Sequence, residues 1–229
     1  SNVLSLGHSA WDIICSLWCR VAMKLNLGAI MPNLISPPKL VIFDCDGVVV
    51  DSESLTLQLM CDDLVSRGLE LSLPEIIDLA LGGTIAGVGG QAKVLGADIP
   101  GDWVNQFYEK MFTALGQSVE LIPGIEAVLD VLDHHGIPYA IGSNGPHRKM
   151  EITLGRCRLA ERFAGRVFSR EDVTNPKPAP DVYLLAATKA GIAPRECVVI
   201  EDSATGARAG VAAGMAVMGF THETPAAKF

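Results

Sequence analysis

The chain of 229 residues can form one large domain, or a core with a small inserted domain. Hydrophobic residues make up 49% of the sequence, which predicts a sizeable core and excludes a generally disordered chain. Lys and Arg total 18 and Asp and Glu total 26, so the net charge of -8 argues against a nucleic-acid-binding or anionic-membrane-binding surface. An anionic substrate stays compatible with this charge, because a metal ion and one or two lysines can set the local field.

The six cysteines are scattered singly, and no Cys-x-x-Cys pair occurs among them. A zinc site is therefore not expected. Unpaired cysteines in a chain of this size are typical of a reducing cytoplasm, which is the location we predict.

Residues 1–38 differ in pattern from the rest of the chain. Residues 10–30 are largely apolar, but no basic segment precedes them and three charges interrupt them: Asp12, Arg20 and Lys24. This is a poor signal peptide and a poor membrane span, so we expect an amphipathic helix. We interpret residues 1–38 as an N-terminal extension from an over-long start and expect a monomer. The alternative is a segment that forms an oligomer contact or attaches to a membrane surface.

The apolar residues 40–43 lead directly into Asp44, and Asp46 and Gly47 follow. The apolar run predicts a strand buried on both faces, as in a parallel sheet. Ligands of such sheets bind at the carboxyl ends of the strands, which is where both carboxylates would lie. Two buried acids need a cation or a reaction that uses their charge. Cys45 between them is a poor nucleophile, since the flanking carboxylates would raise the pKa of its thiol.

Two later apolar runs also end in polar residues. Residues 139–142 precede Ser143 and Asn144, and residues 197–200 precede Glu201 and Asp202. Between these runs, Lys177 lies in a segment whose flanking prolines stiffen its backbone. Strands that alternate with helical patterns predict an α/β fold with a parallel, doubly wound sheet.

Residues 53–118 have a helical pattern throughout. We expect a helix that ends before Gly68, a second that starts at Ser72, and a third over residues 102–115. The glycine-rich residues 82–90 are interpreted as a flexible loop. They do not match a phosphate-binding P-loop, because no strand precedes them and no Gly-Lys-Ser/Thr ends them.

Two groups of basic residues are assigned to the surface. His134 and His135 fall in the last turn of a predicted helix, where a positively charged side chain interacts favourably with the helix dipole. His147, Arg148 and Lys149 fall in the helix after Ser143, and we place them on its exposed face.

Four segments of the sequence, in this order, resemble the four signature motifs of the haloacid dehalogenase (HAD) superfamily in its phosphatase form. The segments are Asp44-Cys45-Asp46-Gly47, Ser143-Asn144, Lys177-Pro178-Ala179-Pro180-Asp181 and Glu201-Asp202. The resemblance runs from about residue 39 to the end. It implies a Rossmann-like core over residues 39–52 and 119–229, with an inserted α-helical C1 cap over residues 53–118.

The resemblance also implies a role for each site residue. Asp44 would be the nucleophile that forms an aspartyl-phosphate, and Asp46 the general acid/base. Ser143 and Asn144 would hold the phosphoryl group, and Lys177 would bridge nucleophile and phosphate.

A magnesium ion is the cofactor that the resemblance implies. Hard carboxylate oxygens with open water positions suit Mg²⁺. The implied ligands are Asp44, Asp46 through its main-chain carbonyl, Glu201 and Asp202.

The expected activity is Mg²⁺-dependent hydrolysis of a small phosphate ester. Haloacid dehalogenases lack the second Asp, so Asp46 favours phosphate-ester chemistry. A sugar phosphomutase of the β-phosphoglucomutase type is the alternative, but such enzymes carry a basic residue in the cap loop and residues 81–86 have none. Residues 143–150 are similar to a stretch in 6-phosphogluconate phosphatases, which favours a sugar phosphate. An alternative of another class is a phospho-acceptor receiver domain without turnover.

Overall fold

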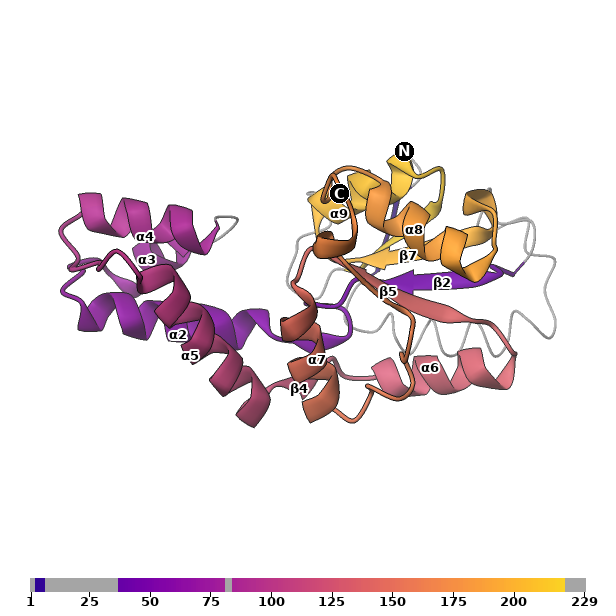
Figure 1. The fold of residues 1–229 in the computed structure, drawn as a ribbon, viewed down its shortest axis with the longest axis horizontal. Coiled ribbons are helices and arrows are strands. Elements are labelled where there is room, and N and C mark those ends of the chain that lie inside the picture. Colours follow the sequence, from indigo (N-terminus) through magenta and orange to yellow (C-terminus); the bar gives the residue numbers. More distant parts are fainter. Residues whose placement is uncertain (1–2, 7–36, 81–83, 221–229) are drawn as a thin grey trace. The chain divides into compact units, whose positions relative to one another are not determined.

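The computed structural model describes residues 3–6, 37–80 and 84–220 (Figure 1). These residues divide into two compact units. Residues 51–119 form a helical unit, and the described residues on either side of this insertion form a core unit. The helix expected over residues 10–30 lies outside the described residues. The assignment of residues 53–118 as a cap stays a prediction.

The core unit is built on a parallel sheet. Among the described residues, this sheet has six strands in the order β1-β8-β7-β2-β5-β6. The strands are β1 (Val3–Leu6), β2 (Leu40–Phe43), β5 (Tyr139–Ser143), β6 (Val167–Ser169), β7 (Cys197–Glu201) and β8 (Ala216–Phe220). The prediction of an α/β fold with a parallel sheet is confirmed, and β2 lies between β5 and β7.

Helices cover both faces of this sheet, which explains why its central strands are apolar at nearly every position. Leu40 and Ile42 of β2 pack into a cluster with residues of the helices α8 (Asp181–Ala190) and α9 (Ala204–Ala212). Figure 1 shows the helix α6 (Ile125–His134) on the face of the sheet opposite to α8. His134 and His135, at the end of α6, are exposed, as predicted.

Shorter elements complete the core unit. The helix α7 (His147–Arg156) follows β5, and two 3-10 helices, η2 (Arg170–Asp172) and η3 (Pro194–Glu196), precede α8 and β7. At the boundary with the helical unit, β3 (Val50–Asp51) and β4 (Glu120–Leu121) form a two-stranded sheet. No described helix is long and apolar enough to cross a bilayer.

The register of the sheet brings the polar strand ends together. Phe43 lies opposite Ile141 of β5 and opposite Ile200 of β7. The N–H of Asp44 then donates to the carbonyl of Ile200 at 2.9 Å. Because the three strands are parallel and aligned, the residues that follow these pairs meet at one edge of the sheet.

The helical unit contains the helices α2 (Glu53–Ser66), α3 (Leu73–Ala80), α4 (Ile85–Val94) and α5 (Trp103–Ser118). The predicted end of the first helix is confirmed, and Gly68 beyond it has a φ of 84°, which glycine adopts without strain. The predicted start of the second is also confirmed, since the Glu75 carboxylate accepts hydrogen bonds from the N–H and hydroxyl of Ser72.

The interpretation of residues 82–90 as a flexible loop is wrong for the part that the structure describes. Residues from Ile85 onward form α4, and the Thr84 hydroxyl caps this helix by accepting the N–H of Gly87 at 3.1 Å. A Cβ at Gly89 would lie 2.5 Å from the Trp103 ring. The glycine therefore lets α4 pack closely on α5, and this packing outweighs the low helix propensity of glycine.

A buried carboxylate joins α2 to α5. Asp63 accepts hydrogen bonds from the Trp103 indole at 2.7 Å, from Arg67 at 2.7 Å and from Lys110 at 3.1 Å. Burial would raise the pKa of Asp63, but these three donors lower it below its ordinary value. Asp63 is thus a structural anchor of the helical unit.

We expect Asp63→Ala to lower the free energy of unfolding of the helical unit by about 2 kcal/mol, the contribution of hydrogen bonds to a charged group. The indole N–H of Trp103, which is buried, would be left without this acceptor. Urea unfolding followed by tryptophan fluorescence measures the loss. Asp62→Ala removes the same charge from an exposed neighbour and is the control. Equal effects of the two substitutions would show that Asp63 is no anchor.

Candidate active site

Asp44 directly follows β2 and begins a tight turn that requires glycine at position 47. Gly47 has a φ of 75°, and a Cβ at this position would lie 2.0 Å from an Asp202 carboxylate oxygen. The glycine is needed both for its backbone conformation and for the space it leaves. The turn thereby brings the segment after β2 against Asp202, which follows β7.

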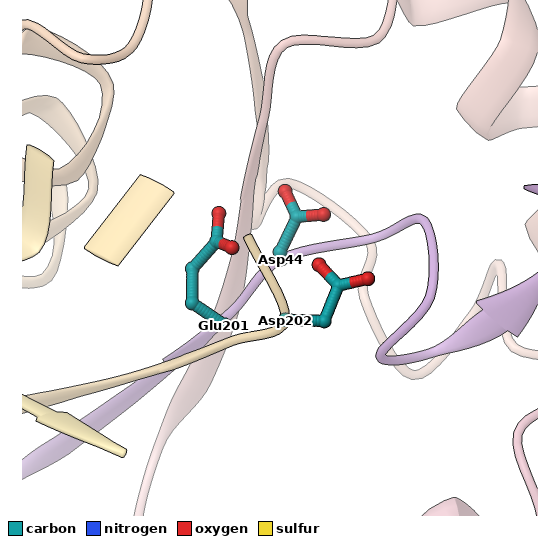
Figure 2. Close-up of side chains that lie close together, drawn as sticks. All are labelled: Asp44, Glu201 and Asp202. Carbon is teal, nitrogen blue, oxygen red and sulfur yellow. The ribbon is translucent and has the colours of Figure 1, made fainter. Parts of the chain in front are cut away.

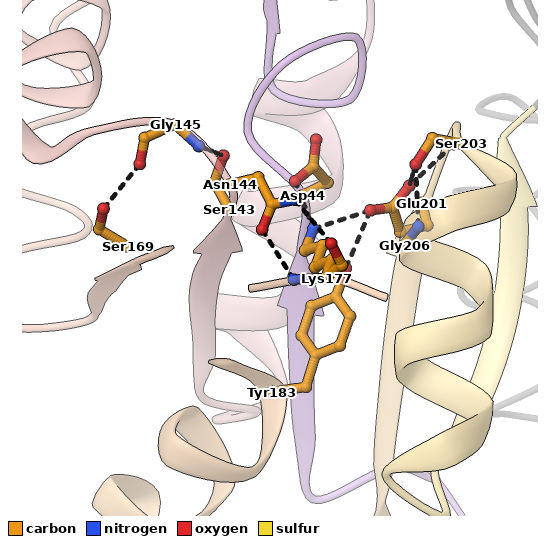
Figure 3. Close-up of polar contacts among 10 residues, drawn as sticks. All are labelled: Asp44, Ser143, Asn144, Gly145, Ser169, Lys177, Tyr183, Glu201, Ser203 and Gly206. Atoms are coloured by element: carbon orange, nitrogen blue, oxygen red, sulfur yellow. Dashed lines mark hydrogen bonds and ion pairs between the residues drawn. The ribbon is translucent and has the colours of Figure 1, made fainter. Parts of the chain in front are cut away.

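Lys177 is the cation at the centre of the site. Its ammonium lies 2.6 Å from the Asp44 carboxylate and 2.7 Å from the Glu201 carboxylate, as Figure 3 shows. Burial alone would lower the pKa of Lys177, but the charges of Asp44 and Glu201 outweigh it and raise the pKa. Lys177 therefore stays charged and joins the ends of β2 and β7.

Asn144 fixes the backbone of this lysine. The Lys177 N–H donates to the Asn144 side-chain oxygen at 2.9 Å, and the Asn144 amide donates to the Lys177 carbonyl at 3.2 Å (Figure 3). Asn144 was expected to hold the phosphoryl group. Its carboxamide instead bonds main-chain groups of Lys177, so its contact with phosphate stays a prediction.

Ser143 lies at the end of β5 and is buried. Its hydroxyl accepts the N–H of Gly145 at 2.9 Å, and the Ser169 hydroxyl donates to the Gly145 carbonyl at 2.7 Å. These bonds fix the loop that leads into α7 beside the other strand ends (Figure 3). The Ser143 hydroxyl still has a proton with which it can donate to an anion.

Glu201 uses all of its acceptor capacity. One carboxylate oxygen accepts from Lys177 and, at 3.0 Å, from the Tyr183 hydroxyl. The other accepts from the N–H and the hydroxyl of Ser203, each at 2.8 Å. A carboxylate has about four lone-pair sites, and these four bonds account for them. Gly206 makes room for this arrangement, because a Cβ there would lie 1.5 Å from a Glu201 oxygen.

Three acids gather at this edge of the sheet. Oxygen atoms of Asp44, Glu201 and Asp202 lie within 4.8 Å of one another, and all three residues are buried (Figure 2). Burial, only partly offset by Lys177, raises the pKa of Asp44 to about 7. A divalent cation would compensate the remaining negative charge, and hard oxygen ligands fit Mg²⁺. The described residues thus fit the implied metal.

Lys149 belongs to this site, and its assignment to an exposed helix face is wrong. Its ammonium lies 2.8 Å from the Asp46 carboxylate, and its side chain is 15% exposed. Burial would lower the pKa of Lys149, but the charge of Asp46 raises it. Its place in the first turn after the Ser143 strand end was the signal that could have identified it.

The surroundings of Cys45 disfavour its thiolate form. Cys45 is fully buried between Asp44 and Asp46. Burial and the charges of these two neighbours raise the pKa of its thiol well above the ordinary value. The direction of this shift agrees with the expectation that the flanking carboxylates raise the pKa of the thiol, although burial is the larger cause.

Comparisons with known proteins agree on one family. Residues 38–214 match the family model described as haloacid dehalogenase-like hydrolase. Hexitol phosphatase A of Escherichia coli is 33% identical over 181 residues, which cover 77% of this chain and 80% of the relative. Fructose-1-phosphate phosphatase YqaB of the same organism is 32% identical over 177 residues, with coverage of 76% and 92%.

Solved structures give the same result. A HAD family hydrolase from Deinococcus radiodurans R1 with bound phosphate and sodium superposes with a TM-score of 0.69 and is 36% identical, covering 80% of each chain. Among the relatives found by sequence alone, the chloroplastic protein SUPPRESSOR OF QUENCHING 1 of Arabidopsis thaliana is 30% identical over 76% of this chain. This chain spans only 17% of that much longer relative.

Substitution of Gly206 should test the packing around Glu201. In Gly206→Ala, the new methyl group forces the Glu201 carboxylate away from its donors, and overpacking of this kind costs about 1–3 kcal/mol. Gly155→Ala is the matched control, since Gly155 lies in α7 with open space around its Cβ position. It should be neutral or stabilise by up to about 1 kcal/mol. Urea unfolding followed by circular dichroism measures both, and similar effects would refute the packing argument.

Proposed function

Because the chain belongs to the haloacid dehalogenase-like hydrolase family, we propose that it is a Mg²⁺-dependent phosphatase that acts through an aspartyl-phosphate. The substrate is a small phosphorylated metabolite, a sugar phosphate. The main support is the buried Asp44 at the end of the central strand, held by Lys177 at 2.6 Å. A carboxylate fixed beside a cation in a site of low dielectric is placed to attack an electron-poor phosphorus.

The reaction takes two steps. An Asp44 carboxylate oxygen attacks phosphorus while the bond from phosphorus to the leaving alcohol oxygen breaks, and Asp46 gives its proton to that oxygen. Asp46, now a carboxylate, then takes a proton from a water molecule whose oxygen attacks the phosphorus of the aspartyl-phosphate. The bond from phosphorus to the Asp44 oxygen breaks, which releases inorganic phosphate and restores Asp44. Lys177 and Ser143 hold the oxygens of the phosphoryl group in both steps.

Mg²⁺, when bound, neutralises charge on the phosphoryl oxygens and so reduces their repulsion of the nucleophile. Asp44 and Asp202 would supply its side-chain ligands, and Asp46 would supply a main-chain carbonyl. Glu201 is part of the same acidic cluster, but its four hydrogen bonds with described residues fit an indirect role. Glu201 holds Lys177 in place and adds negative charge near the ion.

Specificity belongs to residues 53–118, which act as a cap. The core residues of the site recognise only the phosphoryl group, so another part of the chain must select the leaving alcohol. The names of two relatives, hexitol phosphatase A and fructose-1-phosphate phosphatase, support a polyol or sugar phosphate.

The function is tested by incubating the purified protein and Mg²⁺ with a panel of polyol and sugar monophosphates. Release of inorganic phosphate is measured together with the phosphorylated products. Stoichiometric release of phosphate and free alcohol is the expected result. Conversion of one sugar phosphate into an isomer without net release would identify a phosphomutase instead. Absence of both reactions across the panel would refute the proposed function.

Asp44→Asn should abolish turnover, because a carboxamide is not nucleophilic, and should leave the fold intact. Asp46→Asn should lower kcat on an alkyl phosphate by about 10²–10⁴-fold, the usual contribution of general acid–base catalysis. Its KM should change little. Phosphate release under saturating Mg²⁺ measures both, with circular dichroism as the check on folding. Wild-type turnover in Asp44→Asn would exclude this nucleophile.

The two neighbouring acids after β7 should differ in their effects on metal binding. Asp202→Asn removes a proposed ligand and should weaken Mg²⁺ binding by about 10-fold or more, the size of effect seen even for outer-shell partners. Glu201→Gln should weaken it less, but it should lower thermal stability because Lys177 loses a charged partner. Calorimetric titration with Mg²⁺ and thermal unfolding measure the two effects. The reverse order of Mg²⁺ affinities would make Glu201 the direct ligand.

A further inference from the structure

We propose that Lys149 is a positioning residue of this reaction, which holds the Asp46 carboxyl group where it meets the leaving oxygen. This inference rests on the proposed function. It concerns a residue outside the four sequence motifs, in the first turn of α7.

The contact between the two side chains is direct and largely enclosed. The Lys149 ammonium lies 2.8 Å from an Asp46 carboxylate oxygen, with side-chain exposures of 15% for the lysine and 18% for the aspartate. An ion pair held out of water in this way is stronger and more directional than one on the surface. When Asp46 carries the proton that it gives to the leaving oxygen, the Lys149 ammonium can still donate to the other carboxyl oxygen, so the contact holds the group in both protonation states. The contact with Lys149 restricts the rotamers of Asp46, whose side chain lies in the turn after β2 and not in the strand itself.

The lysine is fixed at its backbone, and the Asp46 carboxylate lies close to the same loop. The Lys149 N–H donates to the Pro146 carbonyl at 3.0 Å, so the lysine starts from a formed helical turn. The Asp46 carboxylate lies over the same loop, since a Cβ at Gly145 would be 3.5 Å from an Asp46 oxygen and 3.3 Å from the Ser143 hydroxyl. Figure 3 shows Ser143 and Gly145 in this loop beside Asp44. Lys149 thus places Asp46 next to the proposed phosphoryl-binding hydroxyl.

Each of the two lysines of the site pairs with a different one of the two aspartates after β2. Lys177 lies 2.6 Å from Asp44, and Lys149 lies 2.8 Å from Asp46. A general acid must lie within hydrogen-bond reach of the oxygen that it protonates, and a misplacement of about 1 Å can cost about 10²-fold in rate. Loss of Lys149 should therefore affect the step that depends on Asp46 and not phosphoryl binding itself.

The test uses two substrates that differ in their need for an acid. An alkyl phosphate has a poor leaving group that needs a proton from Asp46, whereas p-nitrophenyl phosphate has a good one that leaves without it. Lys149→Met should lower kcat on the alkyl phosphate by about 10–10²-fold with little change in KM, and should affect p-nitrophenyl phosphate much less. Lys149→Arg should restore part of the lost rate. Lys189→Met, which changes an exposed lysine of α8, is the control and should match the wild type.

A double variant separates positioning from a structural role. If Lys149 acts through Asp46, Lys149→Met should cause little further loss in the Asp46→Asn background. Additive losses, or equal losses on both substrates, would overturn the inference and leave the proposed function standing. A wild-type rate for Lys149→Met would do the same. No turnover of either substrate by the wild-type protein would instead refute the proposed function, and the inference with it.

Discussion

The ion pairs of Lys177 with Asp44 and Glu201 are the interactions on which the site depends. A buried ammonium is costly unless carboxylates and hydrogen bonds replace its water, and here two carboxylates do so at 2.6 and 2.7 Å. Asn144 fixes the lysine backbone from the side of β5. The donors on Glu201 then hold the second carboxylate from the opposite side. Lys177 thus links three strand ends that are far apart in the sequence, two through its side chain and one through its main chain.

The site carries more negative than positive charge, and this excess explains its chemistry. The pKa of Asp44 rises to about 7, chiefly through burial, although Lys177 opposes the rise. Such a cluster is less favourable for the protein alone than for the protein with a bound cation, which is the usual property of a metal site. The second lysine, Lys149, contacts Asp46, two residues after Asp44, the nucleophile that the proposed function requires.

Buried carboxylates in the two units have different roles because their partners differ. Asp63 in the helical unit receives three donors and has a lowered pKa, so it contributes to stability. Asp44 in the core unit receives one cation beside two further acids and has a raised pKa. Burial favours the neutral form of both aspartates, but the donors outweigh it at Asp63 and only partly offset it at Asp44. The balance between burial and the neighbouring donors and charges separates a structural acid from a reactive one.

The sequence by itself determined the strands and the residues at their ends. Apolar runs before Asp44, Ser143 and Glu201 are long enough to read as buried strands, and parallel strands place their carboxyl ends at one edge. Only the tertiary structure decided the partners of Lys149 and Asn144 and the helical state of residues 85–94. A sequence pattern predicts which residues of a segment are buried and which backbone conformation the segment prefers. Which side chains meet across the sheet, and whether a tryptophan fills the space beside a glycine, depends on neighbours that are distant in the chain.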